Sequence, residues 1–380
     1  MPAGNQFAHQ RYSSAPPDAP YELLTPGPMP KVDSPEYVRR MRQVGEALVG
    51  ANVGAIVLIH GTFVGDDPLG INAMLSGPSV DLYRWFTGVT KRRIDWSTGD
   101  IGNFPMSYVR ELAHGIRGEP GRPRPIVRRF VWSSMNNHVA RAVAAVQLVG
   151  YLAKLKLAPR QRILIWAHSH GGNVLALLTN LLTADRDRVA QFLDAAGGYA
   201  RPLDESWDES CRLVMQATSP LHDHPLDLVT LGMPIRYGFD TNGFARLLHF
   251  VNHRPSRRRP DYQATPPHSF GDLVLARRGD YVQQYGIAGS NFSTPFHWRM
   301  WKADRQLAQM LSPNLSCWGL LSRIRQRMRV PRDGKTLLVD YPHQRSQWVR
   351  SLLGHGQYTH RDWMLLHAEQ VVRRFYQDGS

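Results

Sequence analysis

A serine between two histidines, followed by two glycines, is the strongest candidate for chemistry in the chain. Residues 162–166 form a short apolar run that predicts a buried strand, and residues 174–181 carry an apolar helical pattern. Ser169 lies between them, at a turn where the residues two before and two after it must be small for strand and helix to approach. Ala167 and Gly171 meet this requirement. The pattern predicts that Ser169 is a nucleophile on a strained strand-to-helix turn.

A serine that attacks a carbonyl group needs hydrogen-bond donors for the oxyanion that forms. The backbone N–H of His170 is one expected donor, because the helix behind Ser169 directs its free N–H groups and positive dipole end there. A second apolar run, residues 55–59, ends in a His-Gly-Thr turn at residues 60–62. We expect the backbone N–H of Thr62 to be the second donor.

The remaining apolar runs indicate the framework that would hold these groups. Further strands are predicted at residues 126–132, 227–230, 247–251 and 337–339, and a helix with one apolar face at residues 139–155. Strands that alternate with helices in this way predict an α/β fold, with a mostly parallel twisted sheet and helices on both faces.

The chain is expected to divide into an arm and one domain. Residues 1–50 are predicted to form an N-terminal arm, partly irregular, because the first 35 residues are rich in proline, serine and alanine and show no period. This irregular stretch is expected to lie outside the core. Residues 51–380 are predicted to form the catalytic domain.

Composition bears on the cellular location and the binding partners that we expect for the protein. The formal net charge of +15 predicts attraction to polyanions. Cys211 and Cys317 lie far apart without metal-ligand spacing, so neither a disulfide framework nor a metal site is predicted. No apolar stretch reaches about 18 residues, and the first residues lack the apolar segment of a secretory signal. The expected location is cytoplasmic, with export by a signal-independent route as the alternative.

The segments AIVLIHGTF at residues 55–63 and ILIWAHSHGGN at residues 163–173 resemble the α/β-hydrolase superfamily, particularly its lipase and esterase branches. This resemblance implies the α/β-hydrolase fold, a triad in the chain order Ser, acid, His, and no cofactor or metal. It also implies a hydrolase of small-molecule or lipid esters that forms an acyl-enzyme. The stretch around residues 283–335 exceeds the minimal fold, which predicts an insertion there and makes it a candidate cap over the site.

The base of the implied triad should lie near the C-terminus, in a loop before the last helix. His355 lies between two glycines and is the predicted base, with His360 as the secondary candidate. Thr359 followed by Asp362 is typical of a helix N-cap. On this interpretation His360 is the first residue of the closing helix, whereas His355 stays in the loop.

The acid of the triad must follow Ser169 and precede His355, at a strand end where it can accept the imidazole N–H. Asp280 is our prediction, because its Gly-Asp-Tyr-Val turn resembles the acid turn of many lipases. Four loop carboxylates are the alternatives: Asp240, Asp261, Asp272 and Asp340.

Residues 318–330 combine an apolar stripe with four arginines. A basic amphipathic helix of this kind predicts, as an alternative function, peripheral binding to an anionic membrane surface. A non-catalytic binding protein that keeps the hydrolase fold is another alternative. Nucleic acid is not favoured as a partner, because no zinc-finger spacing, RNP-like aromatic motif or glycine-rich phosphate loop accompanies the charge. The oligomeric state and the acyl chain length stay open.

Overall fold

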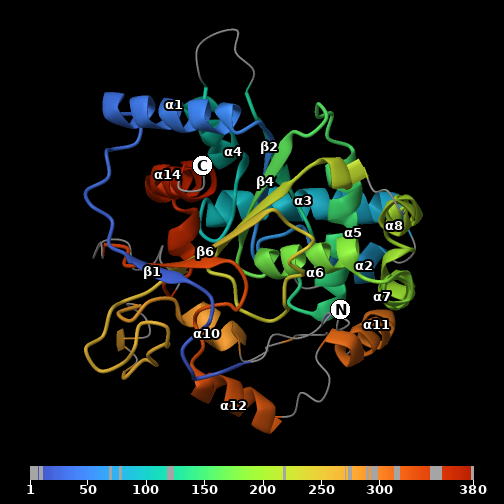
Figure 1. Ribbon diagram of the computed structural model, residues 1–380. Coiled ribbons are helices and arrows are strands. Elements are labelled where there is room, and N and C mark those ends of the chain that lie inside the picture. Colours follow the sequence, from blue (N-terminus) through green and yellow to red (C-terminus); the bar gives the residue numbers. More distant parts are fainter. Residues whose placement is uncertain are drawn as a thin grey trace.

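The computed structural model describes residues 7, 12–67, 71–76, 79–117, 124–216, 220–269, 271–272, 276–287, 291, 298–311, 317–342 and 353–377. Within these residues the chain forms a seven-stranded sheet in which every pair of neighbouring strands is parallel (Figure 1). The spatial order is β1-β7-β6-β5-β4-β2-β3. The strands are β1 (Tyr21–Leu24), β2 (Val53–Ile59), β3 (Ile126–Phe130), β4 (Arg162–His168), β5 (Leu226–Leu231), β6 (Arg246–Asn252) and β7 (Lys335–Val339). The predicted α/β fold and all six predicted strands are confirmed.

Helices cover both faces of the sheet. One face packs against α1, α4 and α14, and the other against the group of α5, α6, α7, α8 and α11. None of the described helices is both long and apolar enough to cross a membrane. The helices are α1 (Pro35–Gly50), α2 (Ile71–Ser76), α3 (Val80–Thr98), α4 (Met106–Gly115), α5 (His138–Ala153), α6 (Gly171–Thr183), α7 (Arg186–Ala200), α8 (Trp207–Met215), α10 (Tyr281–Ile287), α11 (Trp298–Leu311), α12 (Cys317–Gln326) and α14 (Met364–Val372).

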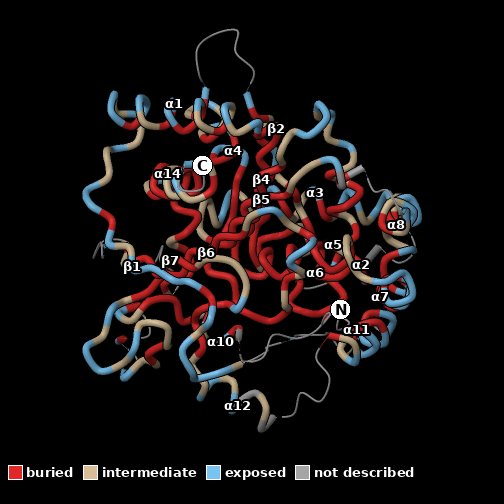
Figure 2. The backbone as a smooth tube through the Cα atoms, viewed as in Figure 1, coloured by how far each residue is buried: buried red, intermediate tan, exposed pale blue. Residues whose placement is uncertain are grey.

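The central strands are buried on both sides, which explains their continuous apolar sequence. In β2, Ile56 and Leu58 join the core under α1 and α4, while Val57 and Ile59 join the core under α5 and α6. Successive side chains of a strand point to opposite faces, so a strand with helices on both faces needs apolar residues at every position. Figure 2 shows the resulting distribution, with buried segments through the sheet and exposed segments on the outer sides of the helices.

The predicted arm joins the folded domain at two places, and at Phe7 its exclusion from the core is wrong. Strand β1 pairs with β7 at the edge of the sheet. The Phe7 ring is 2% exposed and stacks on Phe192 with ring centroids 4.7 Å apart. Helix α1 completes the arm, with Ser34 as its N-cap and Pro35 in its first turn. The reason for the error is physical: a four-residue edge strand has too few positions to show a period, and β7 supplies its pairing from far along the chain.

Glycine 45 tests whether α1 is an integral part of the fold. A Cβ at this position would overlap the backbone of Ile116, which ends α4. We expect Gly45→Ala to lower the free energy of unfolding by about 1 to 3 kcal/mol, because a backbone atom cannot move aside as a flexible side chain can. The measurement is urea unfolding at equilibrium.

Glycine 50 is the matched control, because nothing lies within 4 Å of the Cβ that alanine would add there. Gly50→Ala is expected to leave stability unchanged or to raise it by about 0.4 to 1 kcal/mol. Equal effects of the two substitutions would contradict the packing of α1 on α4.

The predicted insertion around residues 283–335 contains most of α10 and the whole of α11 and α12 before β7 begins. Helix α11 packs against α7 and α5, and its Leu307 and Leu311 are fully buried. Figure 1 shows α12 at the bottom of the view below α10, while α11 lies to the right beside α7. Part of the insertion is therefore built into the core, while its role as a cap stays a prediction.

Candidate active site

Ser169 lies directly between β4 and α6, on a sharply turned backbone. Its φ of +53° falls in the left-handed region, which costs a residue with a side chain about 1 kcal/mol or more. A Cβ at Gly171 would lie 2.9 Å from the backbone oxygen of His60, so a larger residue cannot occupy the start of α6. Ser169 is 4% exposed, and its N–H donates to the Leu231 oxygen at 2.9 Å. The turn has the strained geometry that the sequence predicts.

The structure brings His355 and Asp280 together. The His355 Nδ1–H donates to Asp280 Oδ2 at 2.7 Å, although the residues lie 75 positions apart in the chain. His355 is 4% exposed and Asp280 is fully buried. His355 Nε2 is buried and makes no hydrogen bond within the described residues, neither to Ser169 Oγ nor to any other atom. Hydrogen bonds between a nucleophile and its base are often long in unliganded enzymes. The imidazole is therefore oriented by a carboxylate and free to accept a proton.

Asp280 is held as a carboxylate by its surroundings. Burial by itself raises the pKa of this carboxyl group. The electrostatic effect and the hydrogen bond of the His355 ring oppose that effect, together with hydrogen bonds from the Gln283 N–H at 2.8 Å and the Tyr358 hydroxyl at 2.9 Å. The net result is a pKa below the usual value for aspartate. Asp280 can therefore stabilise an imidazolium on His355.

Tyr358 is a site residue that sequence reasoning missed. Its hydroxyl donates to Asp280 and accepts the Asn252 N–H at 2.7 Å, so it ties the carboxylate to the end of β6. Its ring lies against Gly232, where a Cβ would overlap the ring and where φ is +63°. The sequence shows a glycine, Gly232, just after a predicted strand, but it does not show that the ring packed against this glycine is that of Tyr358, from a distant loop.

The two predicted oxyanion donors lie in the turns that follow β2 and β4. In the part of the chain that the structure describes, the backbone N–H groups of Thr62 and His170 donate no hydrogen bond. The amides on either side of Thr62 are engaged, because Gly61 N–H donates to Gly102 and Phe63 N–H donates to Ser134. His170 occupies the N-cap of α6. Both N–H groups are thus available to a ligand, and their role in an oxyanion hole stays a prediction.

A buried lysine braces the loop that carries Thr62, and no sequence pattern indicated it. The Lys91 ammonium donates to the Val64 oxygen at 2.7 Å and to Asn103 Oδ1 at 3.0 Å, and it pairs with Asp95 at 2.5 Å. Burial lowers the pKa of Lys91, against the opposing effect of Asp95. In the sequence Lys91 looks like an ordinary helix-surface cation, because the acceptors that bury it come from two separate loops.

The three histidines around the elbow are buried and neutral. Burial is the largest cause that lowers the pKa of each, to about 3 for His168 and well below the usual value for His60 and His170. The His168 Nε2–H donates to the backbone oxygen of His355 at 3.0 Å, which links the nucleophile strand to the loop of the predicted base. These histidines position neighbouring groups and do not take up protons at neutral pH.

His360, the secondary candidate for the base, is occupied elsewhere. Its ring caps a 3₁₀ turn, Arg361–Trp363, by accepting the Asp362 N–H at 3.4 Å. The predicted N-cap at Thr359 is wrong: this residue ends the preceding 3₁₀ turn, Gly356–Thr359, and accepts the Gly102 N–H at 2.8 Å. The closing helix α14 starts only at Met364. A local capping pattern was overridden here by a contact from a distant loop.

None of the alternative acids has a described contact with His355. Asp261 accepts from His253 Nε2 at 3.0 Å, and Asp240 accepts the Asn242 N–H at 3.0 Å within its own turn. Asp272 pairs with Arg278 at 3.3 Å, and Asp340 pairs with Arg254. These carboxylates hold local structure.

The segment 318–330 is not one continuous helix, which corrects the sequence interpretation. Helix α12 ends at Gln326, and Arg327 has a φ of +57°. Met328 and Arg329 beyond it are buried, and the Arg329 guanidinium donates to the Asn252 oxygen at 3.2 Å. The side chains of Trp318 and Leu320 lie outside the described residues. Only the helical part can present a basic and apolar surface.

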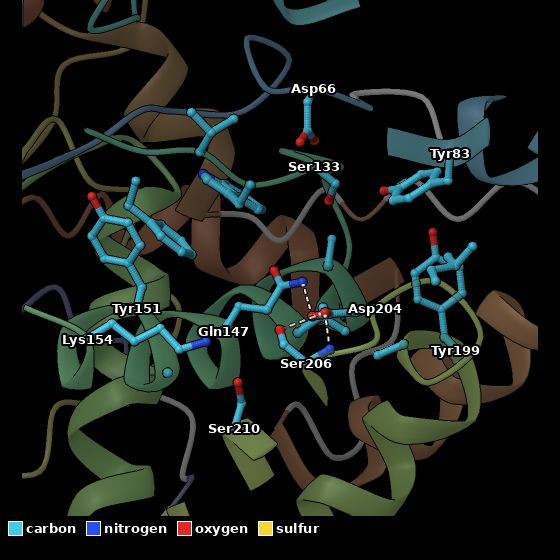
Figure 3. A pocket seen from close by; sticks show the side chains of 18 residues that line it. Asp66, Tyr83, Ser133, Gln147, Tyr151, Lys154, Tyr199, Asp204, Ser206 and Ser210 are labelled. Atoms are coloured by element: carbon cyan, nitrogen blue, oxygen red, sulfur yellow. Dashed lines mark hydrogen bonds between the residues drawn. The ribbon is translucent and has the colours of Figure 1, made fainter. Parts of the chain in front are cut away.

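A cavity of about 310 Å³ lies away from the elbow, between α3, α5 and α7 (Figure 3). Asp66, Tyr83 and Tyr199 line one side of it. Asp204 lies on another side and is engaged by Gln147 at 2.8 Å and by Ser206. Ser169, His355 and Asp280 are not among its lining residues. The cavity is therefore separate from the candidate site.

Nucleophilic acyl transfer needs a hydroxyl, a base and a group that orients the base, and Ser169, His355 and Asp280 are the candidates for these three parts. Among the described residues, no cluster of three or more histidine, cysteine or acidic side chains could hold a metal ion. Comparisons with protein-family models, with curated proteins and with solved structures found no significant match to this chain.

Proposed function

We propose that this protein is a serine hydrolase of the α/β-hydrolase type that cleaves carboxylic esters. The observation that carries the proposal is the hydrogen bond between His355 Nδ1 and Asp280, which leaves Nε2 without a hydrogen bond among the described residues. The His355 backbone oxygen also accepts a hydrogen bond from His168, which directly precedes Ser169 on its strained strand-to-helix turn. The residues follow the chain order Ser, acid, His that α/β-hydrolases use. The parallel sheet, with Ser169 at the end of β4, an inner strand between β5 and β2, is compatible with that fold.

The proposed first half-reaction forms an acyl-enzyme. Ser169 Oγ attacks the ester carbonyl carbon while His355 Nε2 takes the hydroxyl proton, and the carbonyl oxygen becomes an oxyanion. The backbone N–H groups of Thr62 and His170 would bind that oxyanion. When the tetrahedral intermediate collapses, the bond to the leaving alcohol breaks, and His355 gives its proton to that oxygen. Asp280 stabilises the imidazolium in between.

The second half-reaction repeats these steps with water. His355 removes a proton from a water molecule, whose oxygen attacks the acyl carbon and forms a second oxyanion. Collapse breaks the bond to Ser169 Oγ, which recovers its proton from His355. The products are the carboxylic acid and the alcohol, and the enzyme returns to its starting state without a cofactor.

The test is hydrolysis of p-nitrophenyl esters of rising acyl length by the purified chain, combined with labelling by a fluorophosphonate probe. The expected result is turnover together with a single modified peptide that contains Ser169. A chain that neither hydrolyses these esters nor reacts with the probe would be a binding protein with this fold, and a different labelled serine would overturn the assignment of the nucleophile.

We also propose that α12 docks on anionic membrane surfaces. Leu321 is 46% exposed and Ile324 is 40% exposed, and Arg325 beside them is exposed. Apolar and basic side chains on one short helix suit the boundary between acyl chains and anionic headgroups, and the net charge of +15 favours such a surface.

Vesicle sedimentation checks this second proposal. We expect about fivefold or stronger binding when a neutral phosphatidylcholine vesicle receives anionic lipid, and weaker binding in high salt, because exposed charges are screened. Leu321→Ser and Ile324→Ser should weaken binding. Trp96→Ser, which removes an 89% exposed side chain from α3, is the matched control and should not. Vesicle binding that changes with neither lipid charge nor salt concentration would contradict membrane docking.

A further inference from the structure

Two fully buried arginines share one acceptor close to the candidate active site. Arg141 donates from Nε to the Tyr237 hydroxyl at 2.9 Å, from Nη1 to Asn136 Oδ1 at 3.1 Å and from Nη2 to Asn291 Oδ1 at 2.7 Å. Arg236 Nη1 donates to the same Asn291 oxygen at 2.8 Å. Both side chains are 0% exposed. Two buried positive charges thus share one neutral amide oxygen, which belongs to the exposed Asn291.

Hydrogen bonds connect these arginines to the residue that follows the nucleophile. Asn173, in the first turn of α6, lies with Nδ2 3.1 Å from His170 Nδ1 and accepts the Tyr237 N–H at 3.3 Å. The Tyr237 hydroxyl in turn accepts from Arg141. The path from Ser169 to the arginines therefore passes through the His170 ring, one asparagine and one tyrosine.

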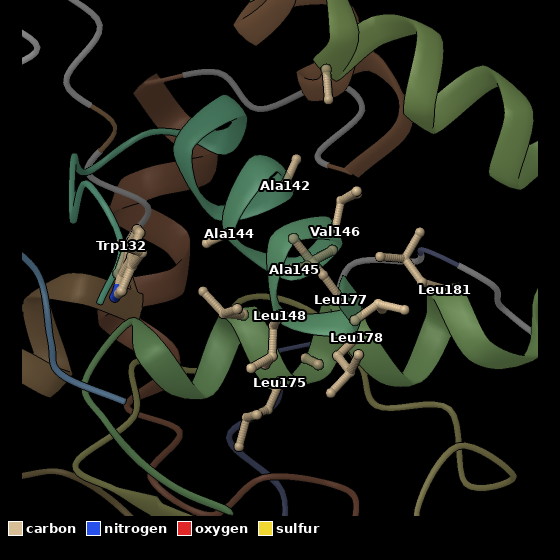
Figure 4. Packing of buried hydrophobic residues seen from close by; sticks show 14 of the residues in the cluster. Trp132, Ala142, Ala144, Ala145, Val146, Leu148, Leu175, Leu177, Leu178 and Leu181 are labelled. Carbon is tan, nitrogen blue, oxygen red and sulfur yellow. The ribbon is translucent and has the colours of Figure 1, made fainter. Parts of the chain in front are cut away.

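The packing of α5 on α6 explains why the cluster lies on the side of Ser169. Figure 4 shows alanines of α5, among them Ala144 and Ala145, beside Leu177 and Leu178 of α6. Both helices connect parallel strands, so both begin at the carboxyl edge of the sheet, where Ser169 also lies. Their N-terminal ends add positive potential to that of the arginines.

The charges of the two arginines act on each other and on His170. Burial and then the charges of Arg141 and Arg236 hold the pKa of His170 well below its usual value. Burial and then the charge of Arg141 lower the pKa of Arg236 to about 10. The chain segments 288–290 and 292–297, which flank Asn291, contain no acidic residue. Asp304 bonds to the backbone N–H groups of His138 and Val139 at the start of α5.

We propose that Arg141 and Arg236 bind an anionic group of the substrate, so that the preferred esters carry a carboxylate or phosphate near the scissile bond. A guanidinium can donate five hydrogen bonds, and Arg141 uses three of them within the described residues. Paired guanidiniums suit a carboxylate or phosphate, because both anions accept two parallel hydrogen bonds. This assignment rests on the proposed ester hydrolase function.

The test compares kcat/KM between esters matched in size and different in charge. Mono-p-nitrophenyl glutarate against p-nitrophenyl valerate places the anion on the acyl side, and 4-acetoxybenzoate against its methyl ester places it on the alcohol side. We expect about a tenfold or larger preference for the anionic member of at least one pair, since a hydrogen bond to a charged group contributes about 1.5 to 3 kcal/mol. Inhibition of valerate hydrolysis by glutarate or by glycerol 3-phosphate would then show which anion binds better.

Variants separate substrate binding from a structural role. Arg141→Gln and Arg236→Gln should lower the ratio of anionic to neutral kcat/KM about fivefold or more, and Arg141→Lys should keep part of it. Arg188→Gln, which removes an exposed arginine of α7, is the matched control and should leave the ratio unchanged. A purely structural role would lower stability and both activities together while the ratio stayed constant.

The outcomes distinguish this assignment from the proposed function. The wild-type protein could hydrolyse the neutral esters and show no preference for the anionic member of either pair. This result would overturn the assignment of the two arginines to substrate binding, but it would support the proposed hydrolase function. Failure to hydrolyse any ester, together with no fluorophosphonate labelling, would overturn both.

Discussion

Ser169→Ala is expected to lower kcat for p-nitrophenyl esters by about 10⁵-fold or more and to abolish fluorophosphonate labelling. The physical reason is that the covalent step disappears: alanine has no oxygen to attack the carbonyl, and the remaining groups can only stabilise direct attack by water. Losses of this size are typical when a member of a triad is removed, because its members act as a unit. The measurement is initial rates with saturating ester, combined with mass spectrometry of the labelled protein.

Ser97→Ala is the control for this experiment. Ser97 is an exposed serine on α3 that bonds only to the Ile94 oxygen within its own helix, at 3.1 Å. Its replacement should leave both activity and labelling unchanged. Thermal unfolding of Ser169→Ala should match that of the wild-type protein within a few degrees, since a single hydroxyl is removed. Persistent labelling after Ser169→Ala would show that another serine is the nucleophile.

His355→Ala is expected to lower kcat by a similar factor, about 10⁵-fold, whereas His360→Ala should lower it less than about tenfold. His355 Nδ1 bonds to the fully buried Asp280, and its Nε2 makes no hydrogen bond among the described residues, whereas the carboxylate beside His360 Nδ1 belongs to the partly exposed Asp362 and the His360 ring caps its own turn. The two variants remove the same side chain five residues apart, so each serves as the control for the other.

Circular dichroism must accompany these rates, because Asp280 is buried and loses its imidazole partner in His355→Ala. The carboxylate keeps its hydrogen bonds from Gln283 and Tyr358, so the fold should persist. A larger loss of kcat in His360→Ala than in His355→Ala, with both variants folded, would move the base to His360.

The elements with strong local patterns could be predicted from the sequence. The continuous apolar runs of β2 and β4 are required by burial on both faces, and such runs are visible without any knowledge of neighbours. The elbow also has a local cause, since Ala167 and Gly171 are needed wherever a strand turns sharply into a helix. A glycine-aspartate turn and a histidine between glycines likewise marked Asp280 and His355, whose catalytic roles remain predictions.

What the sequence could not show depends on partners far apart in the chain. Strand β1 exists because β7 pairs with it. Thr359 does not cap the closing helix, because its hydroxyl oxygen accepts the N–H of Gly102, more than 250 residues away in the chain. Lys91 and Arg141 look like helix-surface cations until distant loops bury them.

Local sequence by itself thus determined the sheet, the nucleophile turn and the short set of candidates for base and acid, because turn sterics and strand burial act over a few residues. Only the tertiary structure brought Asp280, and none of the four alternative acids, into a described contact with His355, and it joined two arginines through one asparagine. The physical reason is that hydrogen bonds and charge interactions depend on distance in space, which one chain segment does not specify for another.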